Sequence, residues 1–318
     1  MAATTLTGSL TSDPKGRSLD LRPVTPIIGA EVHGVDLRAP LVPETVDALQ
    51  HALAEWKVLF FRDQHVTQQQ QIDFGRAFGA LTTGHPVQKA ADGHPEIFAV
   101  DTRRAKALFG HGQPRDPFAP PRRTLTGWHT DITFVANPAK ASVLRGVVVP
   151  PYGGDTLWTN LVAAYEDLSV PVKNFLDGLQ AVHQWHGYDG ETRDDRDEGA
   201  GPPSAVHPLV RVVPETGEKA LFVNPVFTRY VVGLSDRESD ALLHLLFDQI
   251  ERPHFTVRFR WRPDSIAFWD NRTTAHLGPV DLSVAEYDRR VERVTIAGDV
   301  PVGPDGFTSQ PLVGDLFV

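Results

Sequence analysis

The chain is built from short apolar runs of strand length, and this feature constrains its fold more than any other. Proline and glycine interrupt the sequence between these runs, with 26 of each in 318 residues. The runs at 58–61, 141–149 and 265–269 are examples. Many short strands with two or three helices outside them favour a β-sandwich or jelly roll over a parallel sheet of alternating strands and helices. We therefore expect a mainly β fold with flanking helices.

Apolar residues at helical spacing occur in only a few places. They predict helices over 43–57, 67–78 and 235–252, with a further helical stretch around 171–179. The helix over 235–252 is the clearest, because it opens with the serine and glutamate of a capping box. Its apolar stripe is expected to consist of Leu242, Leu245, Leu246 and Ile250.

A single domain is expected over 19–318, after a disordered tail at 1–18. Two polar segments, 103–123 and 187–204, lack hydrophobic periodicity and are long for plain connections in a compact domain. We expect these two segments to be loops that close over a site as lids.

Composition excludes several functional classes. A net charge of −9 argues against nucleic-acid binding, which needs a basic surface. No apolar run approaches the roughly 18 residues of a membrane-spanning helix, and residues 1–15 lack the apolar core of a secretion signal. We therefore expect a cytoplasmic protein that binds no membrane. The absence of cysteine excludes disulfides, thiolate metal sites and cysteine nucleophiles.

A candidate metal site comes from two distant segments. In the string WHTD at 128–131, His129 and Asp131 are two residues apart on an extended segment and so lie on one face of it. His276 follows a hydrophobic run downstream. Two histidines and one carboxylate with open positions form the facial triad of non-haem Fe(II) oxygenases. A dicarboxylate co-substrate for such an iron would need cations, and the sequence offers Arg289, Arg290 and Arg293.

The string WHTD, with six others quoted at the end of this paragraph, resembles the taurine dioxygenase/phenoxyacetate dioxygenase (TauD/TfdA) family of Fe(II)- and 2-oxoglutarate-dependent oxygenases. The resemblance runs from about residue 21 to 301 and is nearest to the members that cleave sulfonates and alkyl sulfates. It implies a double-stranded β-helix, the cupin-like jelly roll. The matching strings are GAEVHGVDL at 29–37, VLFFR at 58–62, WHTDITF at 128–134, GGDTLW at 153–158, HPLVR at 207–211, WDNR at 269–272 with His276, and RVTIAGD at 293–299.

The resemblance also implies roles for individual residues. The iron ligands would be His129, Asp131 and His276. Arg289 matches the arginine that pairs with the distal carboxylate of 2-oxoglutarate, and Thr156 matches the hydroxyl that bonds the same carboxylate. Arg290 competes with Arg289 on sequence alone, although the four-residue spacing to the Arg-Val-Thr segment favours Arg289.

The remaining matches concern the substrate. Arg293 matches the residue that binds the acidic group of the substrate, His85 a histidine beside that group, and Phe227 an aromatic wall. Three positions depart from taurine dioxygenase: one replaces a tyrosine beside the sulfonate-binding histidine, one replaces an asparagine near the taurine amine, and one aligns with smaller or apolar pocket residues. The second of these, a leucine here, suggests a more apolar substrate body. These positions are Gln88, Leu125 and Tyr188.

The predicted activity uses Fe(II), 2-oxoglutarate and O2 to hydroxylate the carbon next to the acidic group of an organic sulfonate or alkyl sulfate. Sulfite or sulfate and an aldehyde would be released, together with succinate and CO2. An aryloxyalkanoate or other carboxylate substrate is the alternative, because an arginine binds either anion. A non-catalytic binding protein and a zinc hydrolase remain further alternatives. The small anionic substrate is the expected partner, and a homo-oligomer (dimer or tetramer) is expected.

Overall fold

The computed structural model describes residues 19–86, 93–101, 127–185, 201–279, 281 and 287–317. The predicted tail at 1–18 and the predicted loop at 103–123 lie outside these residues. Of the second predicted loop, only 201–204 is described, and its last residue already begins a strand.

The largest sheet has seven strands in the order β1-β2-β3-β13-β5-β15-β4. Its neighbouring strands pair antiparallel, except for the parallel pair of β2 and β3. The bounds of these strands are β1 Asp20–Pro23, β2 Ala30–His33, β3 Val58–Phe61, β13 Ile266–Asp270, β5 Ala141–Val148, β15 Arg290–Ile296 and β4 Ile97–Asp101.

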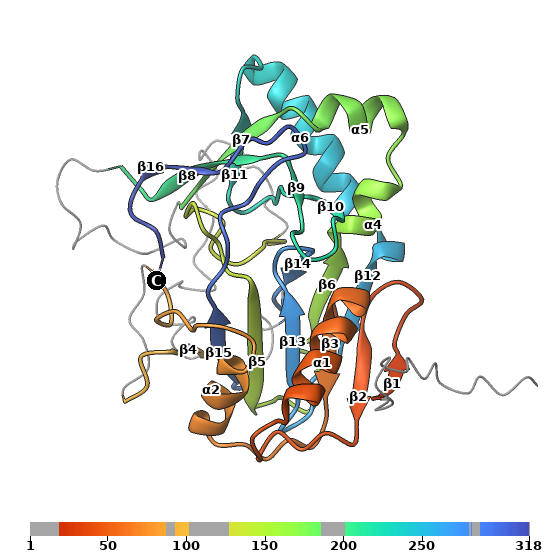
Figure 1. Cartoon of the computed structure of the whole chain (residues 1–318), viewed down its shortest axis with the longest axis vertical. Helices are drawn as coiled ribbons and strands as arrows, with labels where there is room; N and C mark the ends of the chain where they lie inside the picture. The colour runs from red at the N-terminus through yellow and green to blue at the C-terminus, as the bar shows by residue number, and fades with distance from the viewer. Residues whose placement is uncertain are drawn as a thin grey trace, which may run out of the picture.

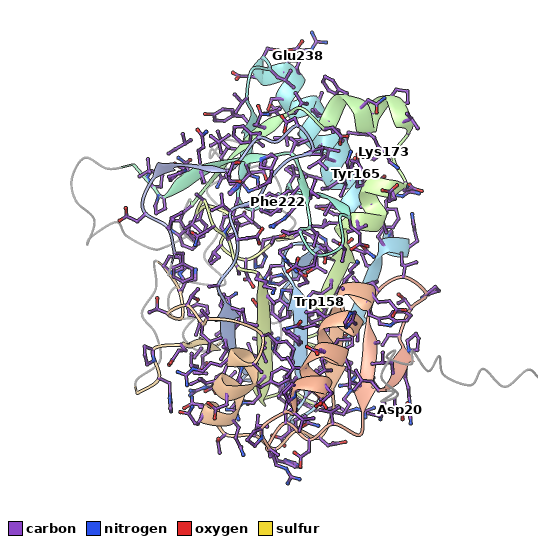
Figure 2. All side chains as sticks on the ribbon, in the orientation of Figure 1. Asp20, Trp158, Tyr165, Lys173, Phe222 and Glu238 are labelled. Atoms are coloured by element: carbon purple, nitrogen blue, oxygen red, sulfur yellow. The ribbon has the colours of Figure 1, made fainter. Side chains whose placement is uncertain are left out.

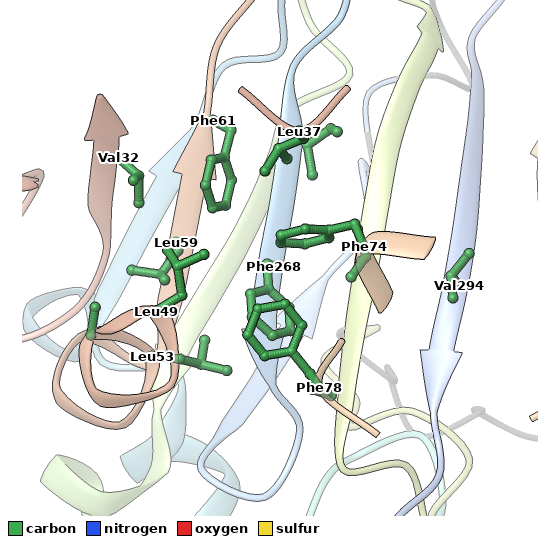
Figure 3. Close-up of a cluster of buried hydrophobic side chains, with 14 of the residues drawn as sticks. Val32, Leu37, Leu49, Leu53, Leu59, Phe61, Phe74, Phe78, Phe268 and Val294 are labelled. Atoms are coloured by element: carbon green, nitrogen blue, oxygen red, sulfur yellow. The ribbon is translucent and has the colours of Figure 1, made fainter. Parts of the chain in front are cut away.

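Two helices, α1 (Pro43–Trp56) and α2 (Gln68–Arg76), cover one face of this sheet (Figure 1). Figure 3 shows the core between them, where Leu49 and Leu53 of α1 lie over the same sheet face as Phe74 of α2. The Phe74 ring meets Phe268 of β13 edge-on, with centroids 5.5 Å apart. The helices form where the sequence predicts them because their apolar faces complete this layer.

A three-stranded sheet, β12-β6-β14, packs against the other face of the large sheet. Trp158 of β6, labelled in Figure 2, is fully buried, and its ring lies 5.5 Å from both Phe60 and Trp269 of the large sheet. Phe60 also stacks on Phe259 at 4.1 Å. Two sheets face to face confirm the predicted mainly β jelly-roll core. The strands are β12 Thr256–Phe259, β6 Thr156–Asn160 and β14 Thr274–Leu277.

The upper part of Figure 1 holds a four-stranded sheet, β11-β7-β8-β16, a two-stranded hairpin, β9-β10, and three helices. Its elements are α4 Leu161–Glu166, α5 Val170–Leu176, β7 Gln180–Gln184, β8 Ser204–Pro208, β9 Val210–Val212, β10 Lys219–Leu221, β11 Thr228–Val231, α6 Asp236–Ile250, the short 3-10 helix η1 Pro253–Phe255 and β16 Gln310–Val313. Across the described part of the chain, no helix has the length and apolar content to cross a membrane.

The helix α6 confirms one prediction and corrects another. Ser235 and Glu238 form the predicted capping box, with each side chain bonded to the backbone of the other residue. The predicted stripe is partly wrong, because Leu245 is 51% exposed whereas Leu243 is fully buried. Five of the six residues from 242 to 247 are apolar, so spacing alone does not settle which of them face the core.

Candidate metal centre

The two predicted histidine ligands face each other across a backbone bridge. The His129 N–H donates to the His276 carbonyl at 2.9 Å, and the His276 N–H donates back to the His129 carbonyl at 2.7 Å. Asp131 follows, and the chain turns at Ile132, whose φ of 49° lies in the left-handed region that β-branched residues rarely adopt. Backbone strain of this kind persists only where the surrounding structure holds it.

Ligand atoms of His129, Asp131 and His276 all lie within 4.8 Å of one another. His276 Nε2 is 3.8 Å from Asp131 Oδ1, which is too far for a hydrogen bond and suits two ligands of one ion. Within the described ranges this is the one cluster of three or more such side chains. The structure therefore brings together all three residues of the predicted triad.

The three side chains are in the protonation states that a divalent ion requires. Burial lowers the pKa of His129 and lowers the pKa of His276 to about 3, so both rings are neutral at pH 7. Burial alone would raise the pKa of Asp131, but the charge of Arg293 and the hydrogen bond from Ser142 hold the pKa below its usual range. His129 Nδ1 lies 2.9 Å from the Gly127 carbonyl, which can only accept. The proton is therefore on Nδ1, and Nε2 is free to bind a metal.

This donor set fits Fe(II). Two neutral imidazoles and one carboxylate, with no sulfur ligand, are the 2-His-1-carboxylate set that leaves coordination positions open on non-haem iron. A structural zinc site would instead be closed by a fourth protein ligand.

The predicted 2-oxoglutarate residues, Thr156 and Arg289, line one cavity together with the triad. Arg289 is buried, and its Nη2 donates to Thr156 Oγ1 at 3.4 Å. Burial lowers the pKa of Arg289 to about 10, so the guanidinium is still charged at pH 7. Trp261, which the sequence did not single out, donates from Nε1 to Thr156 Oγ1 at 3.0 Å. Arg290 points elsewhere and pairs with Glu292 at 2.8 Å, so the cavity contains Arg289 and not its competitor.

The predicted substrate residues Arg293 and His85 lie close to the triad, in a cavity of about 170 Å³. The Arg293 guanidinium contacts the Asp131 carboxylate. Burial, with the charge of Arg293, lowers the pKa of His85 to about 3, so this ring is neutral at pH 7. A cation and a neutral hydrogen-bonding ring beside the metal ligands form a place for a small anion.

The rest of the cavity wall is mostly apolar. Phe227, predicted as an aromatic wall, is buried with its ring centroid 6.1 Å from that of His129. Lining residues that sequence reasoning missed are Phe98, Val100, Ile132, Leu144 and Trp269. The alternation of residues along a strand predicts which residues share a face with Phe98. It does not reveal which other strand lies beside that face, so the alternation alone does not place Phe98 in the cavity wall. The predicted residues Gln88, Leu125 and Tyr188 lie outside the described residues.

Comparisons with known proteins agree with this geometry. A family model described as "Taurine catabolism dioxygenase TauD, TfdA family" matches residues 20–295. An alkylsulfatase of Acinetobacter baylyi is 37% identical over 305 residues, which cover 92% of this chain and 90% of that protein. An alpha-ketoglutarate-dependent sulfate ester dioxygenase of Pseudomonas putida is 37% identical over 314 residues, covering 95% of this chain and 97% of the relative.

A solved structure extends the agreement to three dimensions. The crystal structure of a taurine dioxygenase from Burkholderia xenovorans is similar with a TM-score of 0.81 and 46% identity, covering 93% of this chain and 95% of that chain. The range matched by the family model, 20–295, includes His129, Asp131 and His276. The chain belongs to the taurine catabolism dioxygenase TauD, TfdA family of Fe(II)- and 2-oxoglutarate-dependent oxygenases.

Proposed function

We propose that this enzyme hydroxylates the carbon next to the acidic group of an alkyl sulfate or organic sulfonate. The observation that carries the proposal is the placement of two separate cationic sites around one triad. Arg289 lies with Thr156, and Arg293 lies in the same cavity as His85. A reaction that consumes a dicarboxylate and an organic anion together needs two such sites.

In this proposal His129, Asp131 and His276 hold the iron. When bound, Fe(II) supplies the redox chemistry that couples O2 and the decarboxylation of 2-oxoglutarate, giving succinate and CO2, to hydroxylation of the substrate. Arg289 binds the distal carboxylate of 2-oxoglutarate, because a guanidinium matches a carboxylate with two parallel N–H donors. Thr156 adds a hydroxyl to the same carboxylate.

Arg293 and His85 would hold the sulfate or sulfonate group of the substrate. The neutral His85 ring donates one hydrogen bond without adding a second charge. The apolar wall that includes Phe227 and Ile132 takes up the alkyl body and excludes water from the reaction. After hydroxylation, the carbon bearing both the hydroxyl and the sulfate collapses to an aldehyde, and the proton leaves with the sulfate.

The relatives named for sulfate esters support a sulfate substrate, whereas relatives that act on phenoxy acids are less similar to this chain. The carboxylate alternative stays open because a guanidinium binds a carboxylate as well as a sulfate. Sulfate esters and sulfonates would release sulfate or sulfite, whereas a carboxylate substrate would release neither. The product therefore identifies the substrate class.

The test is a substrate panel with Fe(II)-loaded enzyme. Succinate, aldehyde, sulfate and sulfite are measured with a medium-chain alkyl sulfate, an alkyl sulfonate, taurine and an aryloxyacetate. We expect alkyl sulfate to give the highest kcat/KM, with sulfate and succinate in equal amounts. The His129→Ala variant should lose substrate-dependent succinate formation, while His244→Ala, a matched change on the exposed face of α6, should retain it. Preference for the aryloxyacetate would replace the proposal with the carboxylate alternative.

We further propose that 19–318 forms one catalytic domain that works in the cytoplasm as a homo-oligomer. Light scattering coupled to size-exclusion chromatography measures the oligomeric state. A monomer at micromolar concentration would contradict this proposal.

A further inference from the structure

A chain of three hydrogen bonds connects the wall of the cavity to the carboxylate of the triad. Trp269 Nε1 donates to Asn271 Oδ1 at 2.9 Å, and Asn271 Nδ2 donates to Ser142 Oγ at 2.9 Å. Ser142 Oγ donates to Asp131 Oδ2 at 2.8 Å. All four residues are at most 2% exposed, so water does not compete for these bonds.

The direction of this chain is fixed by its first member. An indole N–H can only donate, so the amide oxygen of Asn271 must face Trp269 and its NH₂ group must face Ser142. The Ser142 oxygen accepts from that amide, and its own proton therefore goes to Asp131. The sequence order of the residues hides this connection, because Ser142 of β5 meets Trp269 of β13 only through strand register.

The two oxygens of Asp131 are consequently not equivalent. Oδ2 accepts from the buried Ser142 hydroxyl. Oδ1 is the oxygen that the Arg293 guanidinium contacts and that lies 3.8 Å from His276 Nε2, on the side of the triad. We propose that Ser142 and Asn271 are positioning residues that hold Oδ2 and thereby present Oδ1 to the metal. The inference rests on the proposed metal site and names what orients its carboxylate.

Trp269 gives the same chain a connection to the second ligand. Its ring centroid lies 5.0 Å from that of His276, so one indole packs against a histidine ligand and begins the chain that ends on the carboxylate. With Oδ2 held by Ser142, Asp131 would offer a metal ion a single oxygen, Oδ1. Partners of this kind, in contact with the metal ligands, are typically worth 10- to 100-fold in metal affinity.

The experiment measures Mn(II) binding by calorimetry on metal-free protein, so that the readout is independent of turnover. We expect Ser142→Ala to weaken Mn(II) binding by about 10- to 100-fold. Asn271→Leu should weaken it by a smaller factor, because Ser142 keeps its hydroxyl but loses the donor that orients its proton. Thr159→Val is the matched control, because it also deletes a fully buried hydroxyl. That hydroxyl donates to the backbone carbonyl of Ile250 at 2.6 Å, away from the triad.

The double variant separates positioning from simple packing. If Asn271 acts through Ser142, the double variant that carries Ser142→Ala and Asn271→Leu should have the same affinity for Mn(II) as the single variant Ser142→Ala. Unchanged Mn(II) affinity in Ser142→Ala, with a thermal midpoint lowered as in Thr159→Val, would overturn the inference and leave the metal site standing. If the unaltered protein and His129→Ala bind Mn(II) equally poorly, the proposed metal site itself fails.

Discussion

Arg293 and Phe98 are direct partners across the β15–β4 pair, and the Arg293 guanidinium carbon lies 5.2 Å from the centroid of the Phe98 ring. The same ring stacks on His85, with centroids 5.1 Å apart and planes 28° from parallel. One aromatic side chain thus contacts both groups proposed to bind the substrate anion. Its position on an edge strand of the large sheet fixes the separation of these two groups.

Replacing Phe98 by leucine should weaken substrate binding more than turnover. The lost cation–π contact is worth about 0.5 to 2 kcal/mol, so KM for the anionic substrate should rise by about 2- to 30-fold with a smaller change in kcat. Steady-state kinetics with the preferred substrate measures this split. Phe74→Leu makes the same change in the core under the helices, and it should leave KM unchanged. An equal rise of KM for 2-oxoglutarate in Phe98→Leu would contradict the assignment.

Arg289 and Arg290 form a natural pair for testing the co-substrate site. Arg289→Ala should raise KM for 2-oxoglutarate by about 10- to 100-fold, because a charge-assisted hydrogen bond is worth about 1.5 to 3 kcal/mol. Arg290→Ala removes only the pair with Glu292 and should change this KM by less than about 3-fold, the ordinary range for a partly exposed ion pair. Initial rates at varied 2-oxoglutarate decide between them, and the reverse order would reject the role of Arg289.

The stack between the two sheets should dominate the stability of the domain. Phe60 is fully buried and stacks on Phe259 at 4.1 Å, so Phe60→Ala should lower the free energy of unfolding by about 3 to 5 kcal/mol. Phe175→Ala on α5, where the side chain is 52% exposed, should change it by about 0.5 kcal/mol or less. Urea denaturation followed by circular dichroism measures both. Similar losses in the two variants would show that the inter-sheet stack is not the main source of stability.

Two buried histidines should make the protein less stable as the pH falls below neutrality. Burial lowers the pKa of His207 to about 3 and that of His183 well below its usual value. In the unfolded chain, histidine has a pKa near 6.5. As the pH falls, the unfolded state therefore binds protons before the folded state does. The contribution of each neutral ring to the free energy of unfolding is complete above about pH 6.5 and is lost as the pH falls toward the pKa of the folded state. The loss is about 1.4 kcal/mol per pH unit for each ring.

Urea denaturation at pH 7 and pH 5 measures this dependence. His207→Gln removes the titrating ring and keeps a side chain that can bond Ser309 and the Thr133 carbonyl, the two partners of His207 at 2.7 Å. This variant should have a shallower loss of stability between the two pH values than the unaltered protein. His244→Gln on the surface of α6 should keep the original dependence. An unchanged slope in His207→Gln would mean that His207 takes up its proton over the same pH range in the folded and unfolded states, which would contradict the lowered pKa.

The triad could be predicted from sequence because local spacing encodes two of its three residues. His129 and Asp131 share one face by parity alone, His276 follows a hydrophobic run downstream, and the resemblance to a family implies that all three bind iron. The chain from Trp269 through Asn271 to Ser142 could not be predicted, because strand register brings these side chains together. Parity tells which face a residue occupies but not which residue lies opposite.

The sequence does not predict the strands β14 and β8, and the reasons are physical. β14, with the sequence TAHL, alternates polar and apolar residues over only four positions, too few to predict a strand, and it pairs with β6. β8 follows a polar segment and ends in a proline, both of which argue against a strand. Each of them holds a buried histidine, His276 in β14 and His207 in β8. One metal ligand and one buried histidine that affects stability thus lie on elements that only long-range pairing specifies.

The backbone bridge between His129 and His276 joins segments that are remote in sequence, in a chain that contains no cysteine. An ion held by both histidines and Asp131 would link these two segments in the folded state, although no disulfide can do so. Binding to the folded state alone also stabilises it by mass action. The enzyme would then depend on iron for its survival against proteases as well as for its activity. Iron starvation would shorten its lifetime and lower the amount of enzyme in the cell.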